Sequence, residues 1–542
     1  RPGSTRLNAR VSDIVFDFLR QNGIDRIFGN PGSTELPMFA DLPPDFSYVL
    51  GLQESIVVGM ADAYSQVTRG AAFVNLHSAA GLGHAMGNIY TAFRNRAPLI
   101  ITTGQQSRQL LPHDPFLFAE SPTEFPKPYV KWAYEPARAE DVPAAIARAY
   151  HTAMQAPRGP VLVSVPLDDW DKVATPPEIR QVAATIGGDP AALGQVARKL
   201  NRARSPVFVV GPGVDIDEAW DSVVELAEAH RARVWVSPMS SRCSFPERHH
   251  LFAGFLPAHQ PALSDCLQGA DLILVLGAPV FTYHFPGMGD HIPAGAELCL
   301  ITDDPKQAAG AAVGTALVSG IRVAAEALLA QASPYRERAK VPARNVPPVP
   351  QPTGITPEYL FQTLSELRSP DSIIVEEAPS ARKAMHDHLP IERPGGFFTT
   401  ASGGLGYGLP AAVGAALAEP RHPVIAIMGD GSSLYSIQSL WSAVEHDVDL
   451  LVIVLNNGGY EALRGIAGKS QARRLSGVDI SHMDFVAIAE AQGCPAMRCE
   501  EGSKLSDCLR DLLKRKGPRL LEVVLREENS VMNVMTRNPA VP

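Results

Sequence analysis

The sequence predicts an α/β protein with three open parallel sheets, and three observations support this class. Apolar runs typical of strands alternate with helical spacing three times along the 542 residues. The alternation is interrupted after Val161–Val165, where Leu167–Pro190 becomes acidic and contains Pro and Gly. It is interrupted again at Val341–Pro357, which carries six prolines and suits a semi-rigid extended linker. We therefore expect domains at about 8–170, 190–338 and 355–530.

Composition indicates a globular protein that acts on small molecules. The hydrophobic fraction is 45%, the charged fraction is 19%, the net charge is −9, and Lys and Arg form no dense run. We therefore expect neither a nucleic-acid surface nor a polybasic membrane patch. Apolar stretches are shorter than the roughly 18 residues that span a bilayer, and Arg1–Arg10 lacks an apolar signal core. The six cysteines show neither C-x-x-C nor zinc spacing, so we expect reduced thiols and a cytoplasmic location.

Three reactive side chains, Ser33, Glu54 and His77, are expected at one rim of the first domain. They follow in turn the predicted strands Arg26–Phe28, Tyr48–Gly51 and Ala71–Leu76, with helices predicted at Val11–Gln21 and Glu54–Gln66. Ligands bind at the carboxyl rim of open parallel sheets, because loops converge there. Taken singly, Glu54 could offset a helix dipole, Ser33 could form a turn, and His77 could be a satisfied polar group. Their coincidence after three successive strands favours a site.

A second constellation is expected in the last domain. Asp430 follows the predicted strand Pro423–Met428, Asn457 follows Leu450–Leu455, and a crossover helix is predicted over Leu434–Glu445. Such a unit brings both strand ends to the same rim. Carboxylate and carboxamide oxygens are hard ligands for Mg²⁺, but two are too few, so the phosphates of a diphosphate must complete its octahedron. The alternative is a glycine turn and an asparagine turn that close two ordinary strands.

The middle domain has the pattern of an open parallel sheet without a nucleotide fingerprint. Gly211-Pro212-Gly213-Val214 follows the first strand and imitates the start of G-x-G-x-x-G. The third glycine is absent, so we reject a dinucleotide site there. Strands are predicted at Pro206–Val210, Val234–Val236, Leu272–Leu276 and Leu298–Thr302.

Several segments together resemble the thiamine-diphosphate-dependent decarboxylases and, within that superfamily, the benzoylformate decarboxylases. The resemblance covers nearly the whole chain, from about Val11 to Val524. It implies the cofactors thiamine diphosphate and Mg²⁺, with Ca²⁺ as a substitute, and the three-domain fold of the superfamily. The segments are Gly429-Asp430-Gly431 with Asn456-Asn457, Phe28–Ser33, Leu52–Glu54, Asn75–Gly81, Gly104–Gln106, Val130–Trp132 and Gly277–His284.

The resemblance implies roles for individual residues. Asp430, Asn457 and the carbonyl of Gly459 would hold the metal. Glu54 would hydrogen-bond N1′ of the aminopyrimidine, and Leu405 would wedge beneath the cofactor and force its V shape. The remaining cofactor contacts are assigned to Asn30, Pro31, Gly32, Gly403, Gly429, Gly431, Ser432 and Tyr460.

The implied reaction is the non-oxidative decarboxylation of a 2-oxo acid, an aryl one such as benzoylformate, to the aldehyde and CO₂. Ser33 would orient the carboxylate, and His77 and His284 would transfer protons, with their division between steps left open. The substrate pocket is assigned to Thr399, Leu463 and Ile466. The family tends to carry aromatic residues at the positions of Thr399 and Ile466, so a different bulky or aliphatic 2-oxo acid is an alternative.

The resemblance also implies an oligomer, because Glu54 and the metal motif lie in different domains. A homodimer or homotetramer with sites shared between subunits is expected. Two rival functions remain open. One is a carboligase of acetolactate-synthase type, against which Ser33, His77 and His284 argue. The other is a degenerate member that only binds cofactor or a partner, which the intact Glu54 and metal motif disfavour.

Overall fold

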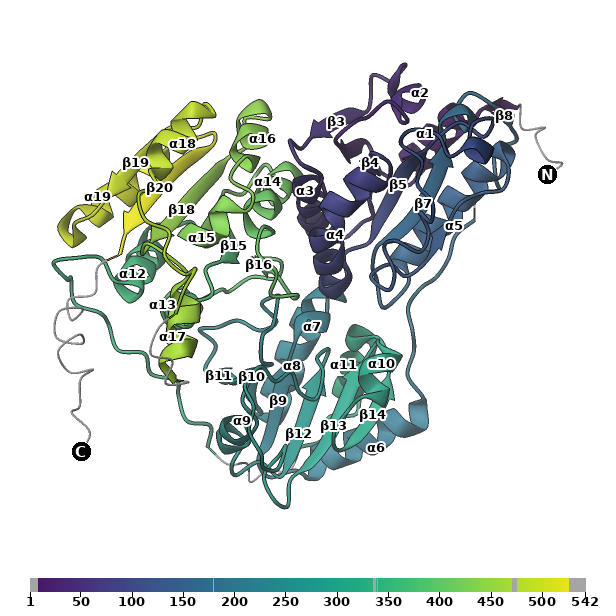
Figure 1. Cartoon of the computed structure of the whole chain (residues 1–542). Helices are drawn as coiled ribbons and strands as arrows, with labels where there is room; N and C mark the ends of the chain where they lie inside the picture. The colour runs from purple at the N-terminus through teal and green to yellow at the C-terminus, as the bar shows by residue number, and fades with distance from the viewer. Residues whose placement is uncertain (1–7, 179, 335–337, 339, 470–474, 526–542) are drawn as a thin grey trace.

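Three parallel sheets organise the chain. The computed structural model describes residues 8–178, 180–334, 338, 340–469 and 475–525. Among them lie three six-stranded sheets whose neighbouring strands all pair in parallel. Figure 1 shows them as three lobes, with the purple N-terminal and the green-to-yellow C-terminal lobes above the teal middle lobe. The predicted α/β class is confirmed. No helix within the described residues has the length and apolarity that a membrane crossing requires.

The N-terminal sheet follows the sequence pattern closely. The predicted helix Val11–Gln21 is α1, and each of the three predicted strands begins and ends within one residue of its expected limits. A short antiparallel pair, β1 (Ala9–Arg10) with β8 (Val173–Ala174), carries this unit beyond residue 170. In sheet order the strands are β3 (Ser47–Leu50), β2 (Arg26–Gly29), β4 (Ala72–Leu76), β5 (Leu99–Gln105), β7 (Val161–Pro166) and β6 (Ala133–Tyr134); the helices are α1, α2 (Leu36–Phe39), α3 (Glu54–Thr68), α4 (Ser78–Asn95) and α5 (Val142–Met154).

The middle sheet has the four predicted strands in its centre and one further strand at each edge. In sheet order these are β11 (Phe252–Phe255), β10 (Arg233–Val236), β9 (Pro206–Val210), β12 (Leu272–Leu276), β13 (Glu297–Thr302) and β14 (Thr315–Val318). The helices are α6 (Pro190–Arg202), α7 (Pro212–Ile216), α8 (Trp220–His230), α9 (Gln260–Cys266), α10 (Pro305–Ala309) and α11 (Ile321–Ala330).

The glycine loop after β9 is used for packing. The Gly211 N–H donates to the Leu276 carbonyl at 3.0 Å, and the Gly213 N–H donates to the Gly277 carbonyl at 2.9 Å. A Cβ on Gly213 would lie 2.7 Å from the Cα of Gly277, so only glycine allows this approach. Because these amide groups are already bonded, they cannot cradle a phosphate. The geometry supports our rejection of a dinucleotide site at this loop.

The C-terminal sheet contains the two strands that carry the metal motif, and they are neighbours as predicted. The crossover helix, however, was wrongly predicted as one segment over 434–445. It is two helices, α15 starting at Asp430 and α16 starting at Ser439, and the Ser433 hydroxyl donates to the Asp430 carbonyl at 2.8 Å. Serine hydroxyls compete with the helical backbone in this way.

In sheet order the C-terminal strands are β16 (Phe397–Thr399), β15 (Ile373–Glu377), β17 (Val424–Gly429), β18 (Leu450–Asn456), β20 (Arg519–Val524) and β19 (Ala496–Cys499). The helices are α12 (Pro357–Leu367), α13 (Arg382–His388), α14 (Gly408–Ala418), α15 (Asp430–Leu434), α16 (Ser439–Glu445), α17 (Glu461–Lys469), α18 (Phe485–Ala491) and α19 (Gly502–Lys514).

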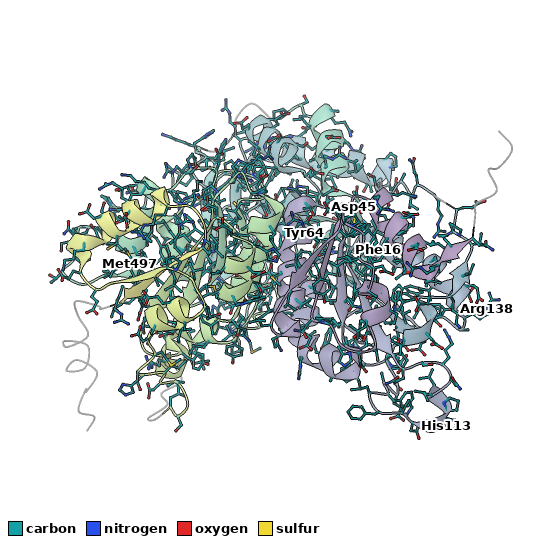
Figure 2. The ribbon with its side chains drawn as sticks, turned by 90° about the horizontal axis from the view of Figure 1, so that it is seen from above. Phe16, Asp45, Tyr64, His113, Arg138 and Met497 are labelled. Atoms are coloured by element: carbon teal, nitrogen blue, oxygen red, sulfur yellow. The ribbon has the colours of Figure 1, made fainter. Side chains whose placement is uncertain are left out.

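The N- and C-terminal domains share one apolar core where α3 meets α14. A single buried cluster contains Met60 from α3 and Val413 from α14. A Cβ on Gly414 would lie 2.0 Å from the Met60 carbonyl oxygen, so the two helix backbones touch at a glycine. Figure 2, seen from above, shows the two domains beside each other, with Tyr64 close to the boundary and Met497 far from it.

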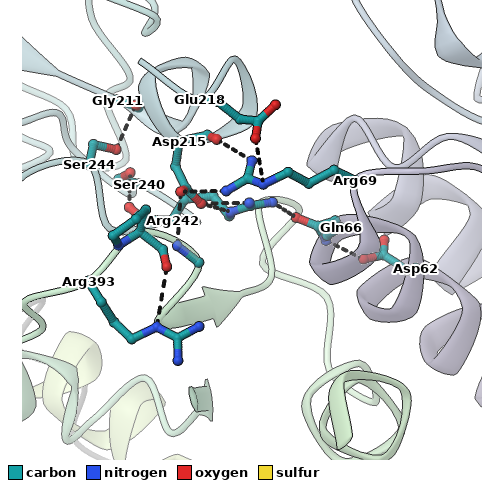
Figure 3. Close-up of polar contacts among 12 residues, drawn as sticks. Asp62, Gln66, Arg69, Gly211, Asp215, Glu218, Ser240, Arg242, Ser244 and Arg393 are labelled. Carbon is teal, nitrogen blue, oxygen red and sulfur yellow. Dashed lines mark hydrogen bonds and ion pairs between the residues drawn. The ribbon is translucent and has the colours of Figure 1, made fainter. Parts of the chain in front are cut away.

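A buried carboxylate joins all three domains. Asp215 of the middle domain is fully buried and accepts from Arg242 Nε at 2.7 Å and from the C-terminal Gly395 N–H at 2.9 Å. Arg69, just beyond α3, reaches the same carboxylate at 3.3 Å, and Arg242 also donates to Gln66 in α3 at 2.5 Å (Figure 3). The helix that begins at Glu54 is therefore fixed at its other end by this network.

Replacing Asp215 with alanine should lower the thermal unfolding midpoint by roughly 5 °C or more. The substitution leaves the buried Arg242 without its counter-ion, and breaking a buried pair costs about 3–5 kcal/mol. Scanning calorimetry of both proteins measures the change. Glu218→Ala is the control, because Glu218 pairs with Arg69 at 3.6 Å but is 66% exposed, and it should leave the midpoint almost unchanged. Equal losses in the two variants would contradict this account of the junction.

Candidate active site

Asp430 stands at the carboxyl end of β17 and is held by backbone amides. It is 3% exposed; Oδ1 accepts from the Gly431 N–H at 2.6 Å. Oδ2 accepts from the N–H groups of Asn457 and Gly459 at 3.1 and 3.0 Å. Burial raises the pKa of Asp430, and these amide bonds oppose the rise. The parallel register that pairs Gly429 with Leu455 brings the two strand ends together, so the predicted rim is formed.

Three oxygens converge at this rim in a way that suits a cation. The side-chain oxygen of Asn457 lies 2.8 Å from the Gly459 carbonyl oxygen and 3.2 Å from Oδ2 of Asp430. Turning the amide over would let its nitrogen donate to both, so the oxygen-inward orientation is favoured only when a cation lies between them. Octahedral Mg²⁺ with bonds of about 2.0–2.1 Å places adjacent ligand oxygens about 2.9 Å apart. The oxygens fit that spacing.

Only one member of this set is a carboxylate. Within the described residues, no three His, Cys, Asp or Glu side chains gather as a metal site. A protein that holds Mg²⁺ through few charged ligands relies on phosphate oxygens to complete the shell. The donor set therefore fits a metal diphosphate better than a free metal ion.

Glu377 holds the loop that carries Leu405 through three hydrogen bonds. This buried carboxylate, at the end of β15, accepts from the N–H groups of Gly406, Tyr407 and Gly408 at 2.8, 2.8 and 2.5 Å. Burial raises the pKa of Glu377 to about 7, while the three amide bonds oppose the rise. Gly403 and Gly406 have φ of 76° and 93°, which favour glycine. Next to Asp430, the Tyr460 ring packs against Gly431. A Cβ on Gly431 would lie 2.5 Å from the Tyr460 ring.

Glu54 opens α3 on the rim of the N-terminal sheet. The side chain of Gln53 caps the helix by accepting from the Ser55 N–H at 2.7 Å. Oε2 of Glu54 lies 3.0 Å from Nδ1 of His84, and the other carboxylate oxygen lies against Gly81. The partner His84 was missed by sequence reasoning, which singled out only His77 and His284 among the histidines. Its position two helical turns after His77, on the same face of α4, is a signal that could have found it.

His77 is seated beneath the loop that carries Asn30, Pro31, Gly32 and Ser33. A Cβ on Gly32 would lie 1.9 Å from the imidazole, so the ring packs directly on this glycine. Nδ1 of His77 lies 2.8 Å from the buried Glu35 carboxylate and 3.2 Å from the Thr34 hydroxyl. Glu35 and Thr34 were also missed, although a Glu in a turn after a strand is a visible signal. Ser33 is exposed beside this group.

The remaining predicted residues do not join these groups within the described chain. His284 is exposed in the middle domain, with its ring against Phe285. Thr399 is 2% exposed, and its hydroxyl donates to the Glu376 carbonyl at 2.8 Å. Leu463 and Ile466, three residues apart on α17, are 49% and 41% exposed. Their assignment to a substrate pocket stays a prediction.

A cavity elsewhere in the chain contains none of these residues. Its volume is about 170 Å³, and it is lined by residues at the amino ends of β9, β10 and β12, including Arg204, Arg233 and Ala270. Ligands bind at the opposite, carboxyl ends of such sheets.

Comparison with known proteins assigns the family. Models of the thiamine pyrophosphate enzymes match all three parts of the chain: the N-terminal TPP binding domain at residues 9–119, the central domain at 193–328 and the C-terminal TPP binding domain at 379–523. The chain belongs to the thiamine pyrophosphate enzymes. Both constellations lie inside or directly beside these matches, as expected for a member of this family.

Individual thiamine pyrophosphate enzymes are similar over nearly the whole chain. Benzoylformate decarboxylase of Pseudomonas aeruginosa is 44% identical, covering 95% of this chain and 98% of the relative. Acetolactate synthase of Mycobacterium bovis is 27% identical, covering 91% and 84%. Benzoylformate decarboxylase from Polynucleobacter necessarius matches with a TM-score of 0.93 at 39% identity, covering 96% and 99%. The thiamine diphosphate-dependent 4-hydroxybenzoylformate decarboxylase of Rhodococcus jostii gives 0.93 at 41%, covering 96% and 100%.

Proposed function

We propose that this enzyme uses thiamine diphosphate and Mg²⁺ to decarboxylate an aryl 2-oxo acid such as benzoylformate, releasing the aldehyde and CO₂. The observation that carries the proposal is the convergence of the Asp430, Asn457 and Gly459 oxygens at Mg²⁺ spacing. The 44% identity to a benzoylformate decarboxylase supports the reaction and the substrate class.

The chain's own residues divide the work. Asp430, Asn457 and Gly459 would hold the metal, and Glu377 fixes the loop that would place Leu405 against the cofactor. Thiamine diphosphate, when bound, supplies the electron sink that loss of CO₂ requires. Glu54 would hydrogen-bond N1′ of its aminopyrimidine ring and hold the proton there.

Ser33, His77 and His284 act on the substrate. The exposed Ser33 hydroxyl orients the substrate carboxylate. His77, whose Nδ1 is held by Glu35, presents its other nitrogen for proton transfer to the substrate oxygen, because a carboxylate at one ring nitrogen fixes the ring. We assign the second proton transfer to His284.

The complete site combines two chains. The Glu54 carboxylate contacts α4 of its own domain, and large apolar side chains stay exposed beside both constellations: Leu36, Leu52, Phe116 and Phe125 beside the first, and Tyr435, Leu463 and Ile466 beside the second. Exposed apolar patches of this kind mark interaction surfaces. A second copy of the chain would cover them and place one chain's Glu54 opposite the other's Asp430.

Complementation tests the shared site. Co-expressed chains with Glu54→Gln and Asp430→Ala, purified through two different tags, should regain activity, since one site of the hybrid then carries both native residues. Each variant alone should be inactive. Decarboxylase assays at equal protein concentration measure the difference. If the hybrid is as inactive as its parents, each chain builds its own site, and this part of the proposal fails.

The substrate class is tested with a panel of 2-oxo acids. We expect turnover of benzoylformate and 4-hydroxybenzoylformate above pyruvate and branched aliphatic acids. Ile466→Phe should raise the ratio of aryl to aliphatic kcat/KM by about two- to tenfold, because an aromatic contact contributes about 0.5–1.5 kcal/mol. Thr399→Phe is the contrasting variant and should destabilise the fold, since Thr399 is buried and hydrogen-bonded. An unchanged ratio for Ile466→Phe would remove α17 from the pocket.

The carboligase of acetolactate-synthase type is the second candidate. The chain is 27% identical to such a synthase and 44% identical to a benzoylformate decarboxylase. The bonded amides of the Gly211 loop also leave no phosphate cradle there for a flavin nucleotide. Both observations favour the decarboxylase. Flavin absorption in the purified protein, together with acetolactate formation from pyruvate, would reverse this order.

A further inference from the structure

The Glu54 carboxylate has an ionisable neighbour. Nδ1 of His84 lies 3.0 Å from Oε2, and the Glu54 side chain is 13% exposed while that of His84 is 62% exposed. The other side of the carboxyl group faces Gly81, where a Cβ would lie 3.1 Å from Oε1. One oxygen is therefore tied to His84, whereas the other meets a residue that has no side chain.

The same stretch of α4 also holds the backbone that carries Glu54. Gln53, which caps α3, donates from Nε2 to the His84 carbonyl at 3.5 Å. One turn further along α4, Asn88 donates from Nδ2 to the Ser55 carbonyl at 2.7 Å. The residues on both sides of Glu54 are thus bonded to α4, and His84 adds a bond to the carboxylate itself. The first turn of α3 and the second turn of α4 form one clamp.

This pair has little to contribute to stability, because half-exposed ion pairs are weak. The geometry of the pair instead indicates a role in orienting the Glu54 carboxylate. A carboxyl group that exchanges a proton with a ring nitrogen must be held at the productive angle, and a donor on one oxygen leaves the other free to face the ring. His77, the other histidine at the start of α4, is held by Glu35 and does not share this role.

We propose that His84 is a positioning residue for Glu54: it binds Oε2 and so aims the carboxyl group at the aminopyrimidine of thiamine diphosphate. The inference rests on the role proposed above for Glu54. His84 acts through Glu54 and touches neither the substrate nor the reacting carbon.

Four variants of the full-length enzyme test the role: His84→Ala, His84→Asn, Glu54→Gln and the double variant Glu54→Gln/His84→Ala. His84→Ala should slow hydrogen–deuterium exchange at C2 of bound thiamine diphosphate by about tenfold, the effect of losing one hydrogen bond to a charged group. Asparagine keeps an N–H donor at a similar reach, so His84→Asn should restore most of the rate. The double variant should be no slower than Glu54→Gln alone.

Calorimetry of thiamine diphosphate and Mg²⁺ binding supplies a readout that is independent of turnover. It should show affinities for both His84 variants within about threefold of wild type, since the clamp affects orientation more than binding. A wild-type exchange rate in His84→Ala overturns the inference, as does an Asn variant as slow as the Ala variant or a double variant slower than Glu54→Gln. If Glu54→Gln itself exchanges at the wild-type rate, the proposed role of Glu54 fails, and that result is separate from the three His84 comparisons.

Discussion

Replacing Asp430 with alanine should abolish Mg²⁺-dependent binding of thiamine diphosphate, with a loss of affinity on the order of 100-fold or more. Asp430 supplies the only carboxylate among the three converging oxygens, so its removal would take the negative charge from the proposed metal site. Its Oδ2 also orders the Asn457 and Gly459 amides, so the other two ligands lose their positions. Isothermal titration calorimetry with and without Mg²⁺ measures the loss.

A matched control distinguishes the loss of a metal ligand from general disruption of the C-terminal rim. Glu461→Gln removes a carboxylate from the first turn of α17, where it pairs with Arg464 and is 49% exposed. Cofactor affinity in this variant should stay close to wild type. The folded state of Asp430→Ala should survive, as judged by circular dichroism. An Asp430→Ala protein that binds both cofactors with wild-type affinity would refute the metal assignment.

Glu54→Gln should slow C2 proton exchange of bound thiamine diphosphate by about 10²–10⁴-fold, the range typical of a lost general acid or base. Glutamine occupies the same space and can still bond to His84, but it cannot give or take a proton. Cofactor affinity should change much less than the exchange rate. NMR after acid quenching measures the exchange, and calorimetry measures the affinity.

Glu54→Asp serves as the comparison for this variant. It keeps the ionisable group but shortens the reach, so its exchange rate should lie between those of wild type and Glu54→Gln. Exchange at the wild-type rate in Glu54→Gln would take Glu54 out of the chemistry. A parallel loss of cofactor affinity and exchange would instead assign it to binding.

The sequence by itself determined the sheets and the rim residues. Buried parallel strands appear in the sequence as continuous apolar runs, and ligand-binding residues lie in the loops that follow the carboxyl end of each run. Asp430 after β17 and Asn457 after β18 were therefore placed correctly, as were Ser33, Glu54 and His77 after their strands. The resemblance in the motifs then supplied the family, which the three domain matches confirmed.

Only the tertiary structure decided which side chains face one another. His84 and Glu54 are 30 residues apart, and their contact depends on how α3 and α4 pack. The Glu377 bonds to the Leu405 loop and the bonds of the Asp215 junction join residues 27 or more positions apart, so no local pattern reports them. Strand and helix periodicities record burial along one element, whereas contacts between elements depend on packing angles that a single sequence does not encode locally.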